Sequence, residues 1–516
     1  MSVRTAMSWP AGLPESFEYP DIPVGAILAG SARRFGDRVA FARGTETMTY
    51  AELGDRAAQF AHGLLARGVS TRDRVALRMP NCLEYPVAYY GVQLAGATFV
   101  PVNPLLPEPA AAAQIADSGA VLTVTAADVP GICAGCPTSP LAVDIDLTAD
   151  LAHLAYTGGT TGESKGVRLP HRNVVVNTLQ YACWGTGSLP ALDGEGGLVL
   201  DQVGSDEEWP TRLGTAMVIN LTPWFHAMGT IAGLNALVLA GCTTTLHERL
   251  DPAAYLADAE RLRVTGIGGA PALFAALLSS PDISGRDLTS VRSISSGAAP
   301  MPVEMIRRLR ALAPDAVVSE GYGLTEVTMG ATLGPAHRSG VRKAGTVGVP
   351  IFDTQVRIDG TTTPGERGEV CIKGPQVMSG YHNRPDATDE VLTDGWLHTG
   401  DIGSLDEDDY LSIVDRMKDM LLYKGYNVYP RELEELLAAQ KSVLAAAVVG
   451  KPDDAVGELP VAFVVPADPS VSANDLKSAI NEQVVPYKHL RHVYLVDSIP
   501  VSAAGKILKR ELRERL

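Results

Sequence analysis

Helix-like and strand-like segments alternate through the first half of the chain. The capping box Thr49-x-x-Glu52 opens an amphipathic run, a strand pattern follows at residues 73–79, and residues 84–97 have the pattern of a helix. The alternation recurs at residues 254–280. Such alternation favours parallel strands, with helices layered on the sheet and ligands at the carboxyl ends of the strands. The chain is therefore predicted to adopt an α/β fold with mostly parallel sheets.

A second kind of pattern begins near residue 350, where short strands replace the alternation. Further along, Pro430 stands at the first turn of an expected helix, and strand patterns and a helix capped by Ser472 follow. At 516 residues the chain also exceeds what one hydrophobic core usually supports. We predict a large N-terminal domain at residues 1–417 that includes a small β-rich subdomain. A small, mobile C-terminal α/β domain is expected at residues 418–516.

Residues 185–214 differ from their surroundings because they are acidic, rich in glycine and weakly periodic. We expect a long surface excursion in the form of a hairpin. Three interpretations stay open from the sequence: a cover over the functional site, a contact between subunits, or a tolerated surface insertion.

Charge and hydropathy exclude several classes of function. The formal net charge of −16 argues against a general nucleic-acid binder and against tight docking to anionic lipid. The C-terminal tail is locally basic, and we interpret it as a solvated helix. The N-terminus lacks the apolar core of a signal peptide, and no apolar run reaches the roughly 18 residues of a membrane span. We therefore expect a cytoplasmic protein with no membrane span and no nucleic-acid partner.

The stretch Tyr156–Val167 reads YTGGTTGESKGV and follows a short apolar segment. Glycines let successive N–H groups point at one anion, threonine hydroxyls add donors, and Lys165 adds a positive charge. The stretch is not a Walker A loop, because the spacing G-x-x-x-x-G-K-[ST] is absent. Its composition nevertheless predicts a cradle for phosphate groups.

Three further polar clusters stand at predicted loops. The segment GYGLTE puts the Thr325 hydroxyl beside the Glu326 carboxylate, an oxygen ligand of the kind that Mg²⁺ prefers. The small residues of SSGAAPM, at 295–301, would let the backbone approach a flat base closely. Asp401 is predicted in a glycine-flanked turn, where it could accept two ribose hydroxyls. Taken alone, Asp401 also fits a plain turn former, and Glu326 a partner of a helix N-cap.

Seven motifs in this order resemble those of the adenylate-forming enzymes, which comprise acyl-CoA synthetases, the adenylation domains of peptide synthetases and firefly luciferase. The motifs are YTGGTTGESKGV, PWFHAMG, SSGAAPM, EGYGLTE, GWLHTGDIG, DRMKDMLLYKGYNVYP and PVSAAGKILKREL. The resemblance runs from about residue 25 to the end, apart from residues 185–214, and is nearest to fatty acyl- and aryl-CoA synthetases. It implies that a carboxylic acid attacks ATP, with Mg²⁺, to give an acyl adenylate and pyrophosphate. Coenzyme A would then accept the acyl group and release AMP.

The residues present suit this chemistry. A carboxylic acid is already ionised at pH 7, so the reaction needs positioning and charge neutralisation more than a general base. By resemblance, Lys506 would bridge the substrate carboxylate and the α-phosphate, and Glu326 would hold Mg²⁺. The catalytic residues implied are Lys506, Thr325, Glu326, His226 and Arg416. The nucleotide-binding residues implied are Thr157, Gly158, Gly159, Thr160, Thr161, Gly162, Lys165, Gly297, Ala298, Ala299, Glu320, Gly321, Tyr322, Gly323, Asp401 and Arg416.

The same resemblance implies a swing of the small C-terminal domain between the two steps. Lys418 falls at the hinge position. The swing would remove Lys506 and bring in the YKGYNV loop, with Gly425 and Tyr426 along the path of coenzyme A. The phosphate loop departs from the family pattern, because Glu163–Ser164 stand where proline usually precedes the lysine.

Small residues line the segment expected to form the acyl pocket. By resemblance His226, Gly268, Gly269 and Ala298 border the acid, and no acidic partner for an amino-acid ammonium is evident. A medium- or long-chain fatty acid or an aryl acid therefore fits better than acetate or an amino acid. A ligase that passes the acyl group to a carrier protein, an inactive nucleotide-binding protein, and a homodimeric assembly stay open as alternatives. The combination of Lys506, Glu326 and Asp401 speaks against an inactive protein.

Overall fold

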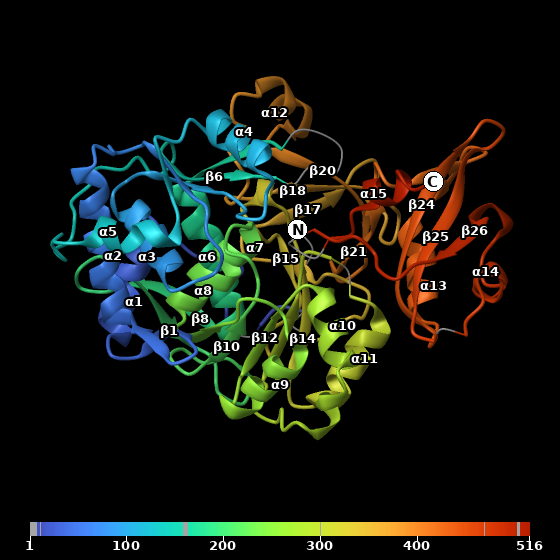
Figure 1. Cartoon of the computed structure of the whole chain (residues 1–516), viewed down its shortest axis with the longest axis horizontal. Helices are drawn as coiled ribbons and strands as arrows, with labels where there is room; N and C mark the ends of the chain where they lie inside the picture. Colours follow the sequence, from blue (N-terminus) through green and yellow to red (C-terminus); the bar gives the residue numbers. More distant parts are fainter. Residues whose placement is uncertain (1–7, 11, 158–163, 300, 469, 503–505) are drawn as a thin grey trace.

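The structure is a computed structural model of the chain and describes residues 8–10, 12–157, 164–299, 301–468, 470–502 and 506–516. Figure 1 shows an N-terminal part, coloured blue to yellow, built from sheets with helices packed around them, and an orange to red C-terminal sheet at one end of the molecule. The predicted α/β class with mostly parallel sheets is confirmed. No helix within these ranges is long and apolar enough to cross a membrane.

The largest sheet, among the described residues, runs in the order β16-β15-β14-β13-β12-β10-β11-β1-β2. Its strands from β14 to β1 pair in parallel, and β15, β16 and β2 add antiparallel pairs at the two edges. The bounds are β1 (Val39–Arg43), β2 (Glu46–Thr49), β10 (Met217–Asn220), β11 (Thr243–Leu246), β12 (Gly266–Gly269), β13 (Ser293–Ser296), β14 (Val317–Tyr322), β15 (Thr332–Leu333) and β16 (Val349–Pro350).

One face of this sheet forms a hydrophobic core with three helices, and the other face borders a cleft. Ile267 and Ile294 pack with α9, α10 and α11. Successive side chains of a strand point to opposite faces, so the intervening Gly268 and Ser295 face away from these helices. That second face looks toward α6, a π-helical turn and α8. The bounds are α6 (His171–Thr186), α7 (Ala227–Thr230), the π-helical turn η2 (Ile231–Asn235), α8 (Ala236–Leu239), α9 (Pro252–Arg261), α10 (Pro271–Ser279) and α11 (Val303–Leu312).

A second sheet, in the order β5-β3-β4-β6-β7, is parallel except for β7, which runs antiparallel to β6. The helix α2 that precedes it begins at the predicted capping box, in which Thr49 and Glu52 each accept the other's backbone N–H. The loop between β6 and β7 is the Gly/Thr-rich stretch. The bounds are α1 (Gly25–Phe35), α2 (Tyr50–Ala66), β3 (Arg74–Leu77), α3 (Glu84–Leu94), β4 (Thr98–Pro101), α4 (Glu108–Ser118), β5 (Leu122–Val124), α5 (Val129–Cys133), β6 (Leu151–Tyr156) and β7 (Gly166–Pro170).

Residues 185–214 contain the predicted hairpin, formed by β8 (Ser188–Leu192) and β9 (Leu198–Gln202). The expectation of a surface excursion is wrong for much of this segment. Leu198 and Leu200 are fully buried on the hairpin, and Trp209 after it is 1% exposed. The hairpin packs against α1, where Arg33 forms an ion pair with Asp193 at 2.7 Å. The apolar residues of this segment stand among glycines and acidic residues, so the hydrophobic periodicity did not indicate their contact with the core.

Two smaller sheets complete the chain. The first runs β17-β18-β20-β19 with β21 beside β20, and the second runs β23-β22-β25-β24 with β26 parallel to β25. The second sheet has its own core with α13 and α14, built around Leu433, Val448 and Ile480. The bounds are β17 (Gln355–Ile358), β18 (Gly368–Lys373), α12 (Pro385–Val391), β19 (Leu392–Thr393), β20 (Trp396–Leu405), β21 (Leu411–Arg416), β22 (Leu421–Tyr423), β23 (Tyr426–Val428), α13 (Pro430–Ala438), β24 (Val443–Asp453), β25 (Gly457–Pro466), α14 (Ala473–Asn481), β26 (His492–Leu495) and α15 (Lys509–Arg513).

The contact between α1 and the hairpin generates a stability prediction. A Cβ atom on Gly30 would lie 2.0 Å from the backbone oxygen of Leu198, so the Gly30→Ala variant has to move backbone apart. We expect a loss of about 1–3 kcal/mol in the free energy of unfolding, seen as a lower thermal midpoint. The matched control is Gly131→Ala in α5, where a Cβ atom meets nothing within 4 Å. Equal midpoints for the two variants would contradict the packing described.

Candidate active site

A single cleft of about 1990 Å³ gathers most of the residues singled out from the sequence. It opens where strands β12 to β14 end and reaches β20, β21 and the segment before α15. The predicted site residues that line it are Thr157, Lys165, His226, Gly268, Gly269, Gly297, Ala298, Ala299, Glu320, Gly321, Tyr322, Gly323, Thr325, Glu326, Asp401, Arg416, Lys418 and Lys506. Gly158, Gly159, Thr160, Thr161 and Gly162 lie outside the described residues.

Asp401 forms the centre of a hydrogen-bonded group. Its carboxylate accepts the Tyr322 hydroxyl at 2.5 Å, and its other oxygen lies 3.5 Å from Nε of Arg416. Burial raises the pKa of Asp401, and the Arg416 guanidinium opposes that rise. The predicted turn is wrong, since Asp401 lies within β20, paired with Arg416 of β21. Gly400 before it has a φ of +71°, a conformation that favours glycine.

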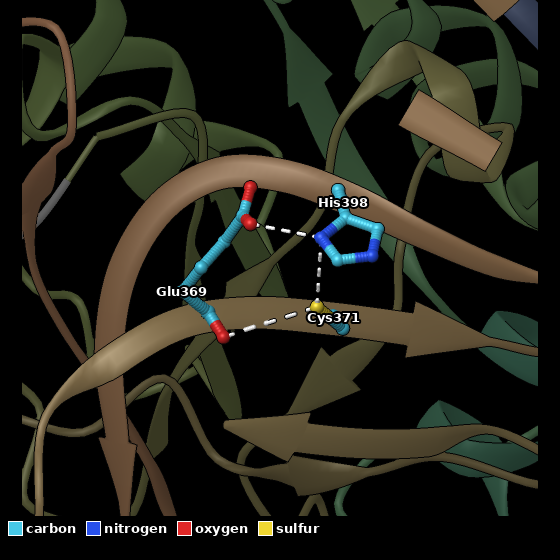
Figure 2. Close-up of side chains that lie close together, drawn as sticks. All are labelled: Glu369, Cys371 and His398. Carbon is cyan, nitrogen blue, oxygen red and sulfur yellow. Dashed lines mark hydrogen bonds and ion pairs between the residues drawn. The ribbon is translucent and has the colours of Figure 1, made fainter. Parts of the chain in front are cut away.

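Three residues that sequence reasoning missed form a cluster next to the segment that precedes Asp401. Figure 2 shows Glu369 and Cys371 of β18 beside His398 of β20. Glu369 accepts from His398 Nδ1 at 2.8 Å and from the Gly400 backbone N–H at 2.9 Å. Their side chains offer potential metal ligands within 4.8 Å of one another. Burial raises the pKa of the Cys371 thiol to about 11. The hydrogen bonds of Glu369 hold the segment before Asp401 in place.

Glu326 has a hydrogen-bonding partner that the sequence did not reveal. It lies in the short 3₁₀ turn Thr325–Val327 after β14, and its Oε1 accepts the Tyr381 hydroxyl at 2.8 Å. Lys165 Nζ lies 4.8 Å from the centre of the Tyr381 ring. Tyr381 therefore connects the carboxylate proposed for Mg²⁺ with the lysine of the Gly/Thr-rich loop. In the sequence Tyr381 stands in the segment SGYHN, which contains no motif that indicates a position in the cleft.

The C-terminal tail inserts Lys506 into the cleft. Burial and the Arg416 charge lower the pKa of Lys506, whereas the Asp401 and Glu326 carboxylates oppose that shift. The following turn is anchored, because Lys509 Nζ lies 2.9 Å from Glu434 and Arg513 lies 2.6 Å from Asp419. The expectation of a merely solvated basic helix is wrong for these residues. Their acidic partners are 75 and more positions away in the sequence, so the pairing depends on the fold.

His226 caps the N-terminus of α7, where its Nδ1 accepts the backbone N–H of Met228 at 3.4 Å. Burial lowers the pKa of His226 to about 4, and the positive charge of Lys506 contributes to the shift. The ring is therefore neutral at physiological pH, and a neutral imidazole can accept or donate a hydrogen bond beside a carboxylate without adding charge.

The loop after β13 brings backbone close to the cleft. Ala298 has a φ of +68°, in the left-handed region that disfavours residues other than glycine, asparagine and aspartate. A Cβ atom on Gly297 would approach Met228 Sδ to 3.0 Å. A side chain at Gly297 would therefore have to displace Met228, and a strained backbone at a ligand cleft is typical of binding loops.

Gly425 and Tyr426 do not line the cleft. Lys424 and Gly425 form the two-residue turn between β22 and β23, both with positive φ values as in a type I′ turn, and Tyr426 is the first residue of β23. Tyr426 is 57% exposed and stacks on Tyr487 with a ring distance of 4.7 Å. The structure thus brings Lys506 to the cleft and leaves the YKGYNV loop outside it.

The neighbouring charges generate a prediction about pH. Titration of isotope-labelled histidine, followed by NMR, should place the pKa of His226 near 4, well below the ordinary 6.5. The Lys506→Ala variant should raise that pKa, because one neighbouring positive charge is lost, while burial keeps it below 6.5. The His226→Gln variant serves to assign the signal. A midpoint at 6.5 in the wild type would contradict the buried placement of the ring.

The chain matches known proteins over nearly its whole length. Residues 28–382 match the AMP-binding enzyme family, and residues 432–506 match the AMP-binding enzyme C-terminal domain. Feruloyl-CoA synthase of an Amycolatopsis species is 37% identical over 94% of this chain and 97% of that protein. The long-chain-fatty-acid–CoA ligase of Bacillus subtilis is 31% identical over 98% of this chain and 97% of that protein.

A solved structure agrees with the arrangement of both parts. The crystal structure of ATP-bound MatB from Rhodopseudomonas palustris superposes with a TM-score of 0.83 at 27% identity, over 96% of this chain and 99% of that one. The chain belongs to the AMP-binding enzyme family and is an adenylate-forming ligase related to the acyl-CoA synthetases.

Proposed function

We propose that this ligase converts an aryl or medium- to long-chain carboxylic acid to its acyl adenylate and then to its coenzyme A thioester. The observation that carries the proposal is the meeting of Lys506, the Asp401–Arg416 pair and Glu326 in one cleft. Lys506 comes from the C-terminal tail and the other three residues from positions 326–416, and the two cations among them suit anionic substrates.

The first step requires the chain to hold two anions together. A carboxylate oxygen of the acid attacks the α-phosphorus of ATP, the bond to the β-phosphate oxygen breaks, and pyrophosphate leaves. Lys506 and Thr325 would hold the acid and the α-phosphate in contact and offset the repulsion between them. Asp401 and Arg416 would hold the ribose hydroxyls. Lys165 and Thr157, with the loop between them, would hold the β- and γ-phosphates.

The carboxylate of Glu326 fits a hard cation. One oxygen is occupied by the Tyr381 hydroxyl, and the remaining lone pairs are open to the cleft. Mg²⁺ takes oxygen ligands and retains water, so one protein carboxylate together with phosphate oxygens is an ordinary site for it. When bound, the metal would neutralise phosphate charge, and Tyr381 would fix the direction from which Glu326 meets it.

The second step needs a path for a thiol. The sulfur of coenzyme A attacks the acyl carbon, the bond to the adenylate oxygen breaks, and AMP leaves with the electron pair. The YKGYNV loop, with Gly425 and Tyr426, would enter the cleft after a rotation at Lys418, near the boundary that we place after residue 417. A ligase that delivers the acyl group to a carrier protein differs only in the acceptor, so thioester formation with free coenzyme A distinguishes the two.

Two named relatives support the range of acids proposed. Feruloyl-CoA synthase is named for an aryl acid, and the Bacillus subtilis ligase for long-chain fatty acids. Gly268, Gly269 and Ala298 leave room for either class at the cleft wall. Pyrophosphate release that depends on an added carboxylic acid would separate this function from that of an inactive nucleotide-binding protein.

Loss of the buried ammonium should affect the first step selectively. The Lys506→Ala variant is expected to reduce acid-dependent pyrophosphate release by about 10²–10³-fold, because one preorganised charge is lost. Thioester formation from a preformed acyl adenylate should change by less than about threefold. The control is Lys441→Ala, which removes an exposed lysine of the same domain. An equal loss in both steps would contradict the separate roles proposed.

The reverse pattern is expected when the YKGYNV loop is blocked. A Cβ atom on Gly425 meets nothing within 4 Å, so Gly425→Leu should fold with only the strain of a φ of +81°. We expect pyrophosphate release to persist and thioester formation from the adenylate to fall by at least about tenfold. Gly457→Leu would be unsuitable as a control because its Cβ meets backbone at 2.6 Å, whereas Gly360→Leu, also at positive φ in open space, is well matched. Equal effects of Gly425→Leu and Gly360→Leu would contradict a role of this loop.

A further inference from the structure

The inner wall of the cleft is a row of glycines and serines on three neighbouring strands. Gly268 of β12 pairs with Ser295 of β13, and Ser295 pairs with Ser319 of β14. One step deeper, Gly266 pairs with Ser293. All five residues line the cleft, on the sheet face opposite the isoleucines that pack with α9 to α11. The wall is therefore flat along the glycines and carries hydroxyl groups beside them.

The opposite wall adds another hydroxyl at the same level. Tyr181 of α6 lines the cleft, and its hydroxyl is close enough to Ser295 that the serine offsets part of the rise in the pKa of Tyr181 caused by burial. Ala232 and Gly233 of the π-helical turn are small and border the same space. The inner cleft is thus bordered by small residues and by a tyrosine hydroxyl that meets the Ser295 side chain.

Two of these serine hydroxyls, those of Ser293 and Ser319, make no hydrogen bond within the described part of the chain, and each of the two side chains is half-buried against the cleft. Partly buried hydroxyl groups that face a cleft and lack a partner within the protein can donate to or accept from a polar group of a ligand.

The depth of the hydroxyls matches a compact acid. Ser295 and Ser319 stand two residues before Gly297 and Gly321, at the level where the nucleotide is expected. Two residues of a strand span roughly 7 Å, so Ser295 lies about that far from Gly297. Ser293, two residues further back, lies roughly 13 Å from Gly297. A carboxylate held beside His226 would place the far end of an aromatic acid between these two levels. A long alkyl chain would instead place methylene groups beside the serine hydroxyls, which would lose their hydration without gaining a hydrogen bond.

We propose that the preferred acid is aromatic and carries an oxygen substituent at the end of the ring remote from its carboxylate, bound by Tyr181, Ser295 and Ser319. This inference rests on the proposed function and narrows its substrate class. The ring lies along Gly266 and Gly268, which have no side chains of their own, and the substituent is within reach of the Ser319 hydroxyl and of the Tyr181–Ser295 pair. Tyr181 and the serines are specificity-determining residues in this arrangement.

The test compares three acids with the full chain, ATP and Mg²⁺, with pyrophosphate release as the readout. The acids are 3-(4-hydroxyphenyl)propenoic acid, unsubstituted 3-phenylpropenoic acid and dodecanoic acid. We expect kcat/KM for the hydroxylated acid to exceed that for each of the others by at least about 30-fold, because a site that hydrogen-bonds a hydroxyl rejects analogues that lack it. An equal or higher kcat/KM with dodecanoic or phenylpropenoic acid overturns the inference and leaves the proposed function standing.

Variants assign the preference to individual residues. Ser295→Ala, Ser319→Ala and Tyr181→Phe should each reduce the ratio between hydroxylated and unsubstituted acid by about tenfold, through a loss with the hydroxylated acid alone. Matched controls are Tyr255→Phe and Ser31→Ala, which remove buried, unpartnered hydroxyls outside the cleft. A ratio that is unchanged in all three cleft variants overturns the inference. Absence of pyrophosphate with every acid, in protein that binds ATP, overturns the proposed function and the inference together.

Discussion

The ammonium group of Lys506 is buried in the same cleft as the Arg416 guanidinium, and the other charged groups of the site have to compensate these two positive charges. A buried cation is stable only near compensating anions. Asp401 and Glu326 supply part of the compensation, yet burial also raises the pKa of Asp401, so its charge comes at an energetic disadvantage. Phosphate and carboxylate groups would complete the balance. The site is thus electrostatically prepared for anionic substrates before any of them enters.

One sheet supplies both the core and the cleft, because its two faces carry different residues. The isoleucines on one side hold α9, α10 and α11 in place. The glycines and serines on the other side would be poor core residues, and they leave space instead. Strand alternation thus lets a rigid element present a binding surface, and the parallel strands deliver their loops to one edge, where Gly297 and Thr325 stand.

The sequence predicted those structural features that depend on residues close together in the chain. The capping box at Thr49, the helix start at Pro430 and the strand-to-loop motifs around Thr325 are encoded within a few positions. Contacts between distant segments could not be read in this way. Tyr381 meets Glu326 across 55 positions, and the glycines around Asp401 indicated a turn, whereas pairing with β21 holds the residue in a strand. Ordered motifs found the cleft, but only the fold identified what fixes each side chain in it.

The proposed two-step cycle requires the cleft to exchange Lys506 for the YKGYNV loop, since a single arrangement presents only one of them. The bonds that join the two parts in this arrangement are suited to exchange. Arg367 and Glu432 form an ion pair at 2.7 Å in which the arginine is 44% exposed, and the backbone N–H of Arg431 donates to Asp415 at 3.0 Å. A partly exposed ion pair contributes little to stability, so its loss can be offset by a similar contact with water or with a new partner.

The apolar core around Leu433 and Ile480 belongs to the C-terminal sheet itself and would move with it. Rotation at Lys418 would therefore break polar contacts and preserve the apolar core of the C-terminal sheet, which is the energetic condition that the proposed change of position requires.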